Sequence, residues 1–190
     1  MLKLNSLSGF GSGAAGAGGV LYGAGYFCGG RTTGVANASP ITDKIVFATG
    51  VTAANTDATL TVGRGFHMGI TNPTGGSGYI MGGTTPPSTW ESPTTCDQIT
   101  YATETTAANT DVVLSAASRW GQTAGYSNDS GGAGYVTGGN TGARTAQTAK
   151  LTFATDTFAI ATDANLGTAI KEGTAVSNNG VAGYYFGGDL

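Results

Sequence analysis

The hexapeptide Gly25-Tyr26-Phe27-Cys28-Gly29-Gly30 decides the fold of this chain, because its pattern Gly-Tyr-x-x-Gly-Gly recurs three more times. The further copies occupy residues 78–83, 134–139 and 183–188, at offsets of 53, 56 and 49 residues. Self-similarity at such a period is the signature of a repeat architecture. The sequence therefore predicts three full units followed by a terminal stub.

Two further blocks recur in the same order within each unit. The first reads Asp-Lys-Ile-Val-Phe-Ala-Thr in the first unit, and its copies begin at residues 43, 97 and 149. The second, Ala-Ala-Asn-Thr-Asp, begins at residues 53 and 107 and more loosely at 159, and each copy is followed by a leucine (Leu60, Leu114 and Leu166). The agreement of three blocks fixes the register of the repeat.

The composition favours strands. Glycine contributes 34 of 190 residues and charged residues only 10%, and apolar residues alternate with period two in the Ile-x-Phe block. We expect three or four strands per unit: Tyr-x-x before the double glycine, the Ile-x-Phe/Tyr block, a strand beginning at the leucine, and a weaker one at 66–70, 123–127 and 174–177. The double glycines suit a strand end with positive φ or close backbone approach, and the Ala-Ala-Asn-Thr-Asp blocks are expected to form tight hairpin turns.

The repeat resembles the kelch repeat of β-propellers: a strand ending in Gly-Gly, a strand with an aromatic residue, and a leucine followed by a basic residue. The sequence of the repeat is most similar to the kelch-like repeats in bacteriophage tail and fibre proteins. The structural repeat residues are then the double glycines and the basic residues: Gly29, Gly30, Gly82, Gly83, Gly138, Gly139, Arg64, Arg119 and Lys171. The resemblance implies an all-β, kelch-like repeat protein of three blade-like units of about 50 residues plus a terminal strand, as a β-propeller or an open blade array.

The expected domains are a glycine-rich N-terminal arm (1–24) and a repeat domain (25–190), with units 25–77, 78–133 and 134–182 and a stub at 183–190. The spaced Tyr and Trp of the common kelch repeat are missing. Three units are also too few for a ring of typically 4–8 blades. Either copies of the chain complete a ring, most simply two chains with six blades, or the units form an open array. The stub is a natural strand to lend to a neighbour.

Several motifs invite a chemical interpretation. Residues 11–16 match the dinucleotide-binding glycine pattern but lack the strand, helix and acidic residue that it requires. His67 is the single histidine and is expected to be incidental. Asp57, Asp111 and Asp163 recur as calcium ligands would, yet too few carboxylates accompany them, so turn capping is favoured. Asp43 and Asp97 are expected to pair with the recurring basic residues of adjacent units.

The variable stretches after the double glycines are expected to be loops where binding would be built. Trp90 and Glu91 lie in the longest of them, and Trp120 follows Arg119. Tryptophan and arginine are common anchors of interfaces. These three residues, Trp90, Glu91 and Trp120, are the candidate binding-loop residues, although a loop-packing role is equally open.

No catalytic constellation, cofactor site or metal site is expected, and Cys28 and Cys96 are expected to be buried or half-buried thiols. The net charge of −3 and the scattered basic residues give no footprint for nucleic acid, and no apolar run is long enough for a membrane span. The N-terminus does not have the pattern of a secretory signal. The predicted function is a non-enzymatic virion component of a bacteriophage, extracellular after release, that associates with itself and other virion proteins. The alternative is a propeller that binds carbohydrate or a receptor, such as a host-surface glycan; an enzyme on this scaffold is the weakest reading.

Overall fold

The computed structural model describes residues 23–31, 38–85, 94–114, 124–140, 142–178 and 180–189. Within them the chain is all-β and forms four antiparallel sheets. The expected all-β class is therefore confirmed. The predicted arm at 1–24 lies outside the described residues except for its last two positions.

Each sheet is built from strands that follow one another along the chain. The first sheet has the order β1 (Ala24–Cys28), β2 (Thr42–Val46) and β3 (Val51–Asn55). The second has the order β4 (Met68–Asn72), β5 (Ser77–Met81), β6 (Cys96–Thr100) and β7 (Thr105–Asn109). The third has the order β8 (Ala124–Asn128), β9 (Ala133–Thr137), β10 (Thr148–Thr152) and β11 (Thr157–Ile160). The fourth pairs β12 (Thr174–Asn178) with β13 (Ala182–Phe186).

In the first three sheets the Gly-Tyr strand (β1, β5 or β9) pairs with the strand that follows it (β2, β6 or β10), and the register is the same each time. Gly25 is opposite Ile45, Gly78 opposite Ile99, and the third sheet repeats the pairing. A Cβ atom at Gly25 would come within 3.1 Å of the Phe47 ring, and one at Gly78 within 2.6 Å of the Tyr101 hydroxyl, so at these two places glycine leaves room for the aromatic residue that follows the facing strand. The predicted weak strands are confirmed as β4, β8 and β12, and they start the second, third and fourth sheets.

Two predictions about local structure were wrong. The Ala-Ala-Asn residues form the outer strands β3 and β7 rather than turns, because the reversal occurs just before them, at positions where Gly50, Glu104 and Asp156 adopt positive φ. The leucines do not begin a strand. Leu60 and Leu114 lie in the connection to the next sheet and are buried in the core.

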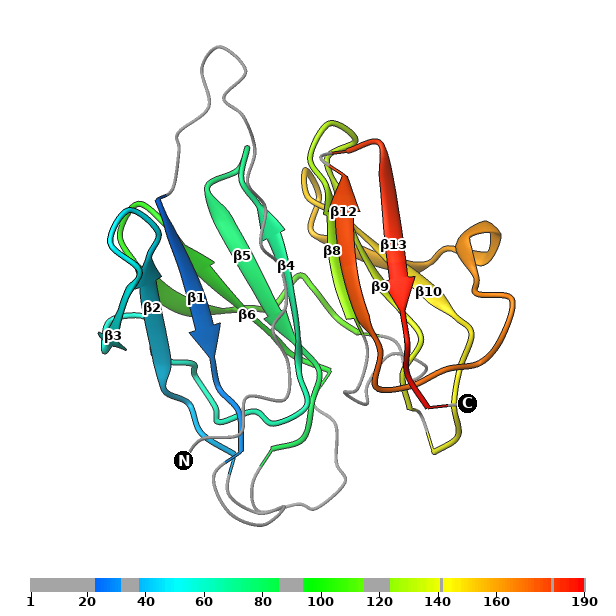
Figure 1. The fold of residues 1–190 in the computed structure, drawn as a ribbon, viewed down its shortest axis with the longest axis horizontal. Helices are drawn as coiled ribbons and strands as arrows, with labels where there is room; N and C mark the ends of the chain where they lie inside the picture. The colour runs from blue at the N-terminus through cyan, green and yellow to red at the C-terminus, as the bar shows by residue number, and fades with distance from the viewer. Residues whose placement is uncertain are drawn as a thin grey trace.

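The sheets stand side by side, with the first sheet at the left of Figure 1 and the third and fourth at the right. The leading strands β4, β8 and β12 contact one another in turn. One apolar cluster, with Leu60 and Ile99, joins the first two sheets, and a second, with Tyr79 and Leu151, joins the second and third. The core is thus a series of layers between sheets. No helix among the described residues has the length and apolarity to cross a membrane.

Candidate functional site

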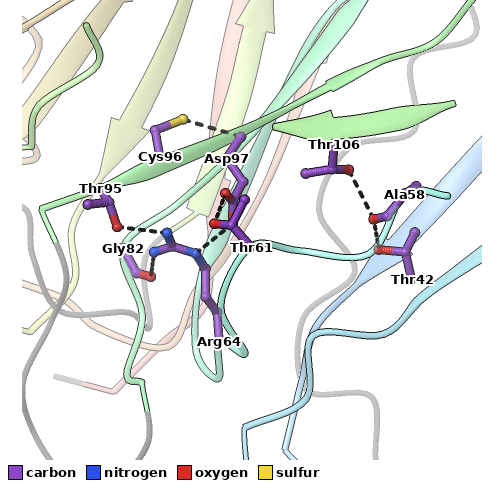
Figure 2. Close-up of polar contacts among 9 residues, drawn as sticks. All are labelled: Thr42, Ala58, Thr61, Arg64, Gly82, Thr95, Cys96, Asp97 and Thr106. Atoms are coloured by element: carbon purple, nitrogen blue, oxygen red, sulfur yellow. Dashed lines mark hydrogen bonds and ion pairs between the residues drawn. The ribbon is translucent and has the colours of Figure 1, made fainter. Parts of the chain in front are cut away.

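A buried ion pair joins the first two sheets. Arg64 follows Leu60 in the connection out of the first sheet, and Asp97 lies on β6 in the second. The Arg64 Nε lies 3.3 Å from Asp97 Oδ2, and both side chains are fully buried. Figure 2 shows how the guanidinium is used: its other nitrogens donate to the Gly82 carbonyl at 3.1 Å and to Thr95 Oγ1 at 2.8 Å. Thr61 Oγ1 donates to the same carboxylate.

The predicted pairing of Asp97 with a basic residue of the adjacent unit is therefore confirmed. The pair is buried rather than exposed, so breaking it has a far larger energetic consequence than breaking a surface ion pair. In the third unit Ala149 replaces the aspartate. Lys171 instead lies 3.2 Å from Asp189 Oδ2, and Arg144 lies 3.0 Å from the other oxygen of that carboxylate. These two cations, Arg144 first, lower the pKa of Asp189.

A second inter-sheet contact uses a carboxylate at a hairpin turn and was not predicted from the sequence. Glu104, between β6 and β7, accepts a hydrogen bond from Asn55 Nδ2 of the first sheet at 2.8 Å and pairs with Lys44. Asp156, between β10 and β11, accepts one from Asn109 Nδ2 of the second sheet at 2.8 Å. Both carboxylates sit at positive φ. We call these two residues the turn carboxylates; their matching place in the repeat is the signal that could have revealed them.

The tyrosines of the Gly-Tyr motif form a third inter-sheet contact. Tyr26 stacks on Tyr101 of the second sheet, with ring centroids 5.6 Å apart and planes 4° apart. Tyr79 stacks on Phe153 of the third sheet at 5.7 Å and 3°. The Tyr79 hydroxyl also donates to Asp156 at 2.8 Å. Burial, together with this neighbouring carboxylate, raises the pKa of Tyr79 to about 12. A tyrosine of one sheet thus stacks each time on the aromatic residue that follows the Ile-x strand of the next.

The double glycines receive the backbone of the connections between sheets. Gly29 has φ +66, and a side chain there would come within 2.8 Å of the Arg64 carbonyl. Gly138 has φ +70 and would come within 2.7 Å of the Ile170 carbonyl. The neighbouring N–H groups of Gly30 and Gly139 donate to these carbonyls, each at 2.8 Å. Both reasons for glycine given by the sequence, positive φ and close approach, apply at these positions.

The first and fourth sheets expose apolar side chains whose equivalents between the other sheets are buried or partly buried. In the first sheet Phe47 is 46% exposed, at the place of Tyr101 and Phe153. In the fourth sheet Tyr184 and Phe186 are 48% and 51% exposed. Among the described residues β13 is paired only on the side of β12. Exposed apolar residues and unpaired strand edges are common features of interaction surfaces.

A pocket of about 260 Å³ opens between the third and fourth sheets. It is lined by Tyr126 and Tyr135, whose rings stack at 5.6 Å, by Ser127 and Asn128, and by Ala164 and the turn at 180–183. Its walls are both aromatic and polar. It is a candidate binding site that the sequence did not indicate.

The other candidate residues, His67, Cys28 and Cys96, are buried or partly buried, which suits a structural role. His67 is buried and its Nδ1 has no hydrogen-bond partner; burial, followed by the nearby Arg64 charge, lowers its pKa to about 4. Burial raises the thiol pKa of Cys28 to about 11 and that of Cys96 to about 12. Thiols with such pKa values carry little reactive thiolate at neutral pH.

The recurring aspartates do not cap the turns. Asn55 Oδ1 accepts from the Ala58 N–H at 3.2 Å, and Asn109 Oδ1 accepts from the N–H groups of Asp111 and Val112 at 3.0 and 3.1 Å. The asparagines are therefore the capping residues. No group of three or more potential metal ligands occurs in the described part of the chain.

The candidate binding-loop residues Trp90, Glu91 and Trp120 lie outside the described residues, as does Arg119. Their predicted roles stay predictions. No family model matches the chain, and no curated protein matches its sequence.

Proposed function

We propose that this chain is a non-enzymatic structural protein of a bacteriophage virion, a tail, fibre or capsid-surface component that assembles with copies of itself through its β repeats. Its sheets are proposed to act as kelch-like blades, in a propeller completed by several chains or in an open array. The partners are further copies of the chain and other virion proteins.

The observation that carries the self-association is the contrast between inner and end sheets. The first and second sheets, and likewise the second and third, are joined by a turn carboxylate and an aromatic stack, and the first of these junctions also contains the buried ion pair. At the two ends the corresponding apolar residues Phe47 and Tyr184 are exposed. An interface that is repeated within a chain favours head-to-tail association with the same surface of another copy.

The assignment to a virion is supported by the kelch-like sequence of the repeat and by a composition with few charged residues and many threonines. The direct test is mass spectrometry of purified phage particles from a host that encodes the chain. Peptides of this protein in intact particles, together with neighbouring genes for capsid, tail tube or portal, are the expected result. Absence from the particles would refute the virion assignment.

Self-association is tested by measuring the mass of the full chain in solution by light scattering across a concentration series. We expect a defined oligomer, with dimers as the simplest closed form. A monomer at all concentrations contradicts the proposal.

A carbohydrate-binding function is the second candidate, and the pocket beside Tyr126 and Tyr135 favours it because aromatic faces flanked by polar groups suit a sugar ring. A glycan array with the full chain, with Tyr135→Ala and with Trp90→Ala tests this. Binding lost in either variant supports a lectin-like role at that place, and no bound glycan counts against it.

A further inference from the structure

We propose that Lys44 and Asn55 become joined by an isopeptide bond, an amide between the lysine Nζ and the asparagine Cγ that forms within the folded chain and releases ammonia. The bond ties β2 to the outer strand β3 of the first sheet. The inference is independent of the proposed self-association and of the virion assignment, because every group that it uses lies in one chain.

The strand pairing places the two side chains on one face of the β2–β3 hairpin. Lys44 is opposite Ala53, and Asn55 is opposite Thr42. Residues two apart on a strand share a face, so Lys44 and Asn55 are diagonal neighbours on the same face. A long side chain reaches its diagonal neighbour across an antiparallel pair. This face is turned toward the second sheet, whose Glu104 contacts both residues.

Glu104 bridges the two reacting groups with the two oxygens of its carboxylate. Its Oε1 pairs with Lys44 Nζ, and its Oε2 accepts a hydrogen bond from Asn55 Nδ2 at 2.8 Å. One carboxylate therefore contacts both the nitrogen that attacks and the nitrogen that leaves. A carboxylate so placed is a general base toward the amine and, once protonated, a general acid toward the leaving group.

The carbonyl oxygen of the Asn55 amide also has a suitable donor. Asn55 Oδ1 accepts a hydrogen bond from the Ala58 N–H at 3.2 Å. The Ala58 carbonyl is held by the hydroxyls of Thr42 at 2.8 Å and Thr106 at 2.9 Å, as Figure 2 shows. Attack on Cγ moves negative charge onto Oδ1, and a fixed N–H that points at this oxygen stabilises that charge.

The reaction balances without any further reagent. Glu104 takes one proton from the Lys44 ammonium, and the freed electron pair of Nζ forms the bond to Asn55 Cγ. Glu104 then gives its proton to Nδ2, the Cγ–Nδ2 bond breaks, and its electron pair leaves with ammonia. The ammonia takes up the second proton that Nζ loses and departs as ammonium. The products are the new amide and ammonium, and Glu104 is again a carboxylate.

The partial burial of the site sets the expected pace. The side chains of Lys44 and Glu104 are 27% and 34% exposed, so water reaches both groups. An alkyl amine attacks only in its neutral form, which is the minor form of lysine at neutral pH. We therefore expect a slow reaction that continues long after folding. Because the released ammonia is diluted into solvent, the crosslinked product accumulates.

The other two hairpins show that the lysine is not needed for the contact between sheets. In β6–β7 the Asn109 amide binds Asp156, but Gln98 stands at the place of the lysine and accepts from Asn109 Nδ2 at 3.1 Å. In β10–β11 Lys150 is present, but Ala161 stands at the place of the asparagine. Among these three described hairpins, β2–β3 alone combines an amine, an amide and a facing carboxylate.

The mass of the intact, denatured chain tests the bond directly. The wild type is measured when freshly purified and again after several weeks at neutral pH. We expect a growing population that is lighter than the sequence predicts by one ammonia. Digestion of that population should give a branched peptide in which Lys44 and Asn55 are joined, identified by tandem mass spectrometry. A chain that keeps its full mass throughout overturns the proposal.

Lys44→Arg removes the nucleophile and keeps a cation beside Glu104. We expect this variant to keep its full mass while its circular dichroism matches that of the wild type. The matched control is Lys150→Arg at the equivalent place in the third hairpin, which should lose ammonia as the wild type does. Loss of ammonia that persists in Lys44→Arg would come from a cyclic imide at an asparagine, and would overturn the isopeptide bond.

Glu104→Gln tests the proton transfer. Glutamine retains an oxygen that can accept from Asn55 Nδ2, but it does not take up a proton from the amine. We expect loss of ammonia to slow by about 10²–10⁴-fold, the usual contribution of a general acid–base group. An unchanged rate in the folded variant overturns the role assigned to Glu104. The wild-type and Lys44→Arg measurements decide the existence of the bond even where Glu104→Gln fails to fold.

Discussion

Arg64 and Asp97 come from different repeats and form an ion pair that is fully buried, with Arg64 Nε 3.3 Å from Asp97 Oδ2. Arg64 lies in the connection that follows β3 of the first sheet, and Asp97 lies on β6, the third strand of the second sheet. The guanidinium also holds the Gly82 carbonyl at the end of β5. One arginine therefore fixes the spacing between two sheets, and its environment makes that spacing sensitive to single substitutions.

Asp97→Ala is expected to lower the free energy of unfolding by about 3–5 kcal/mol, because it leaves the Arg64 charge buried without its counter-ion. Urea unfolding followed by circular dichroism measures this. The control is Asp111→Ala, which removes an exposed carboxylate and should change stability by no more than about 0.5 kcal/mol. Equal losses in the two variants would contradict the role of the buried pair.

Asp156→Gly is expected to lower the free energy of unfolding by about 1–3 kcal/mol. It removes the acceptor of the Asn109 and Tyr79 hydrogen bonds, each worth about 1.5–3 kcal/mol to a charged group, while glycine relieves the positive φ. The reverse change, Gly50→Asp, puts a carboxylate at the equivalent turn and should add strain without a stabilising contact. A gain in stability from Gly50→Asp in the monomer would be inconsistent with this account.

Gly29→Ala and Gly187→Ala separate backbone strain from close approach. Both glycines have nearly the same positive φ, +66 and +62, so each substitution should cost about 1–2 kcal/mol through the left-handed conformation. A side chain at Gly29 also meets the Arg64 carbonyl at 2.8 Å, whereas none of the described atoms lies within 4 Å at Gly187. We expect Gly29→Ala to cost a further 1–3 kcal/mol or so, as measured by denaturant midpoints at equal slope.

The pH dependence of stability should reveal His67. Its pKa is lowered from 6.5 to about 4 in the folded chain, so the unfolded state takes up the proton first. The contribution of neutral His67 is complete above pH 6.5 and is lost as the pH falls through about 4, by roughly 3 kcal/mol in all.

His67→Gln provides the comparison, since glutamine does not titrate and Gln122 occurs near this place in the next repeat. The difference between the wild type and this variant in the slope of unfolding free energy, between pH 7 and pH 4.5, isolates the histidine. Parallel curves would show that the imidazole reaches solvent.

The sequence predicted the period, the all-β class, the strands around Gly-Tyr and the pairing of Asp97, because each leaves a mark at equal spacing. The outer strands were mistaken for turns because Ala-Ala-Asn has low strand propensity, and pairing with β2 and β6 overrides that preference. The turn carboxylates escaped notice because glutamate and aspartate replace each other and glycine stands in the first copy. The pocket is lined by residues from β8, β9, Ala164 and the turn at 180–183, and no single stretch of sequence shows that these segments come together.

The distribution of the turn carboxylates and their asparagines determines how such a chain can be lengthened. The first unit carries Asn55 but has Gly50 at the place of the turn carboxylate, and the third carries Asp156 but has Ala161 at the place of the asparagine. Only the second unit has both, with Glu104 facing back and Asn109 facing forward. A duplicated second unit would therefore fit against itself, whereas a duplicated end unit would not. A longer chain, whether it arises by gene duplication or by design, is therefore expected to gain copies of the second unit between an unchanged first and third unit.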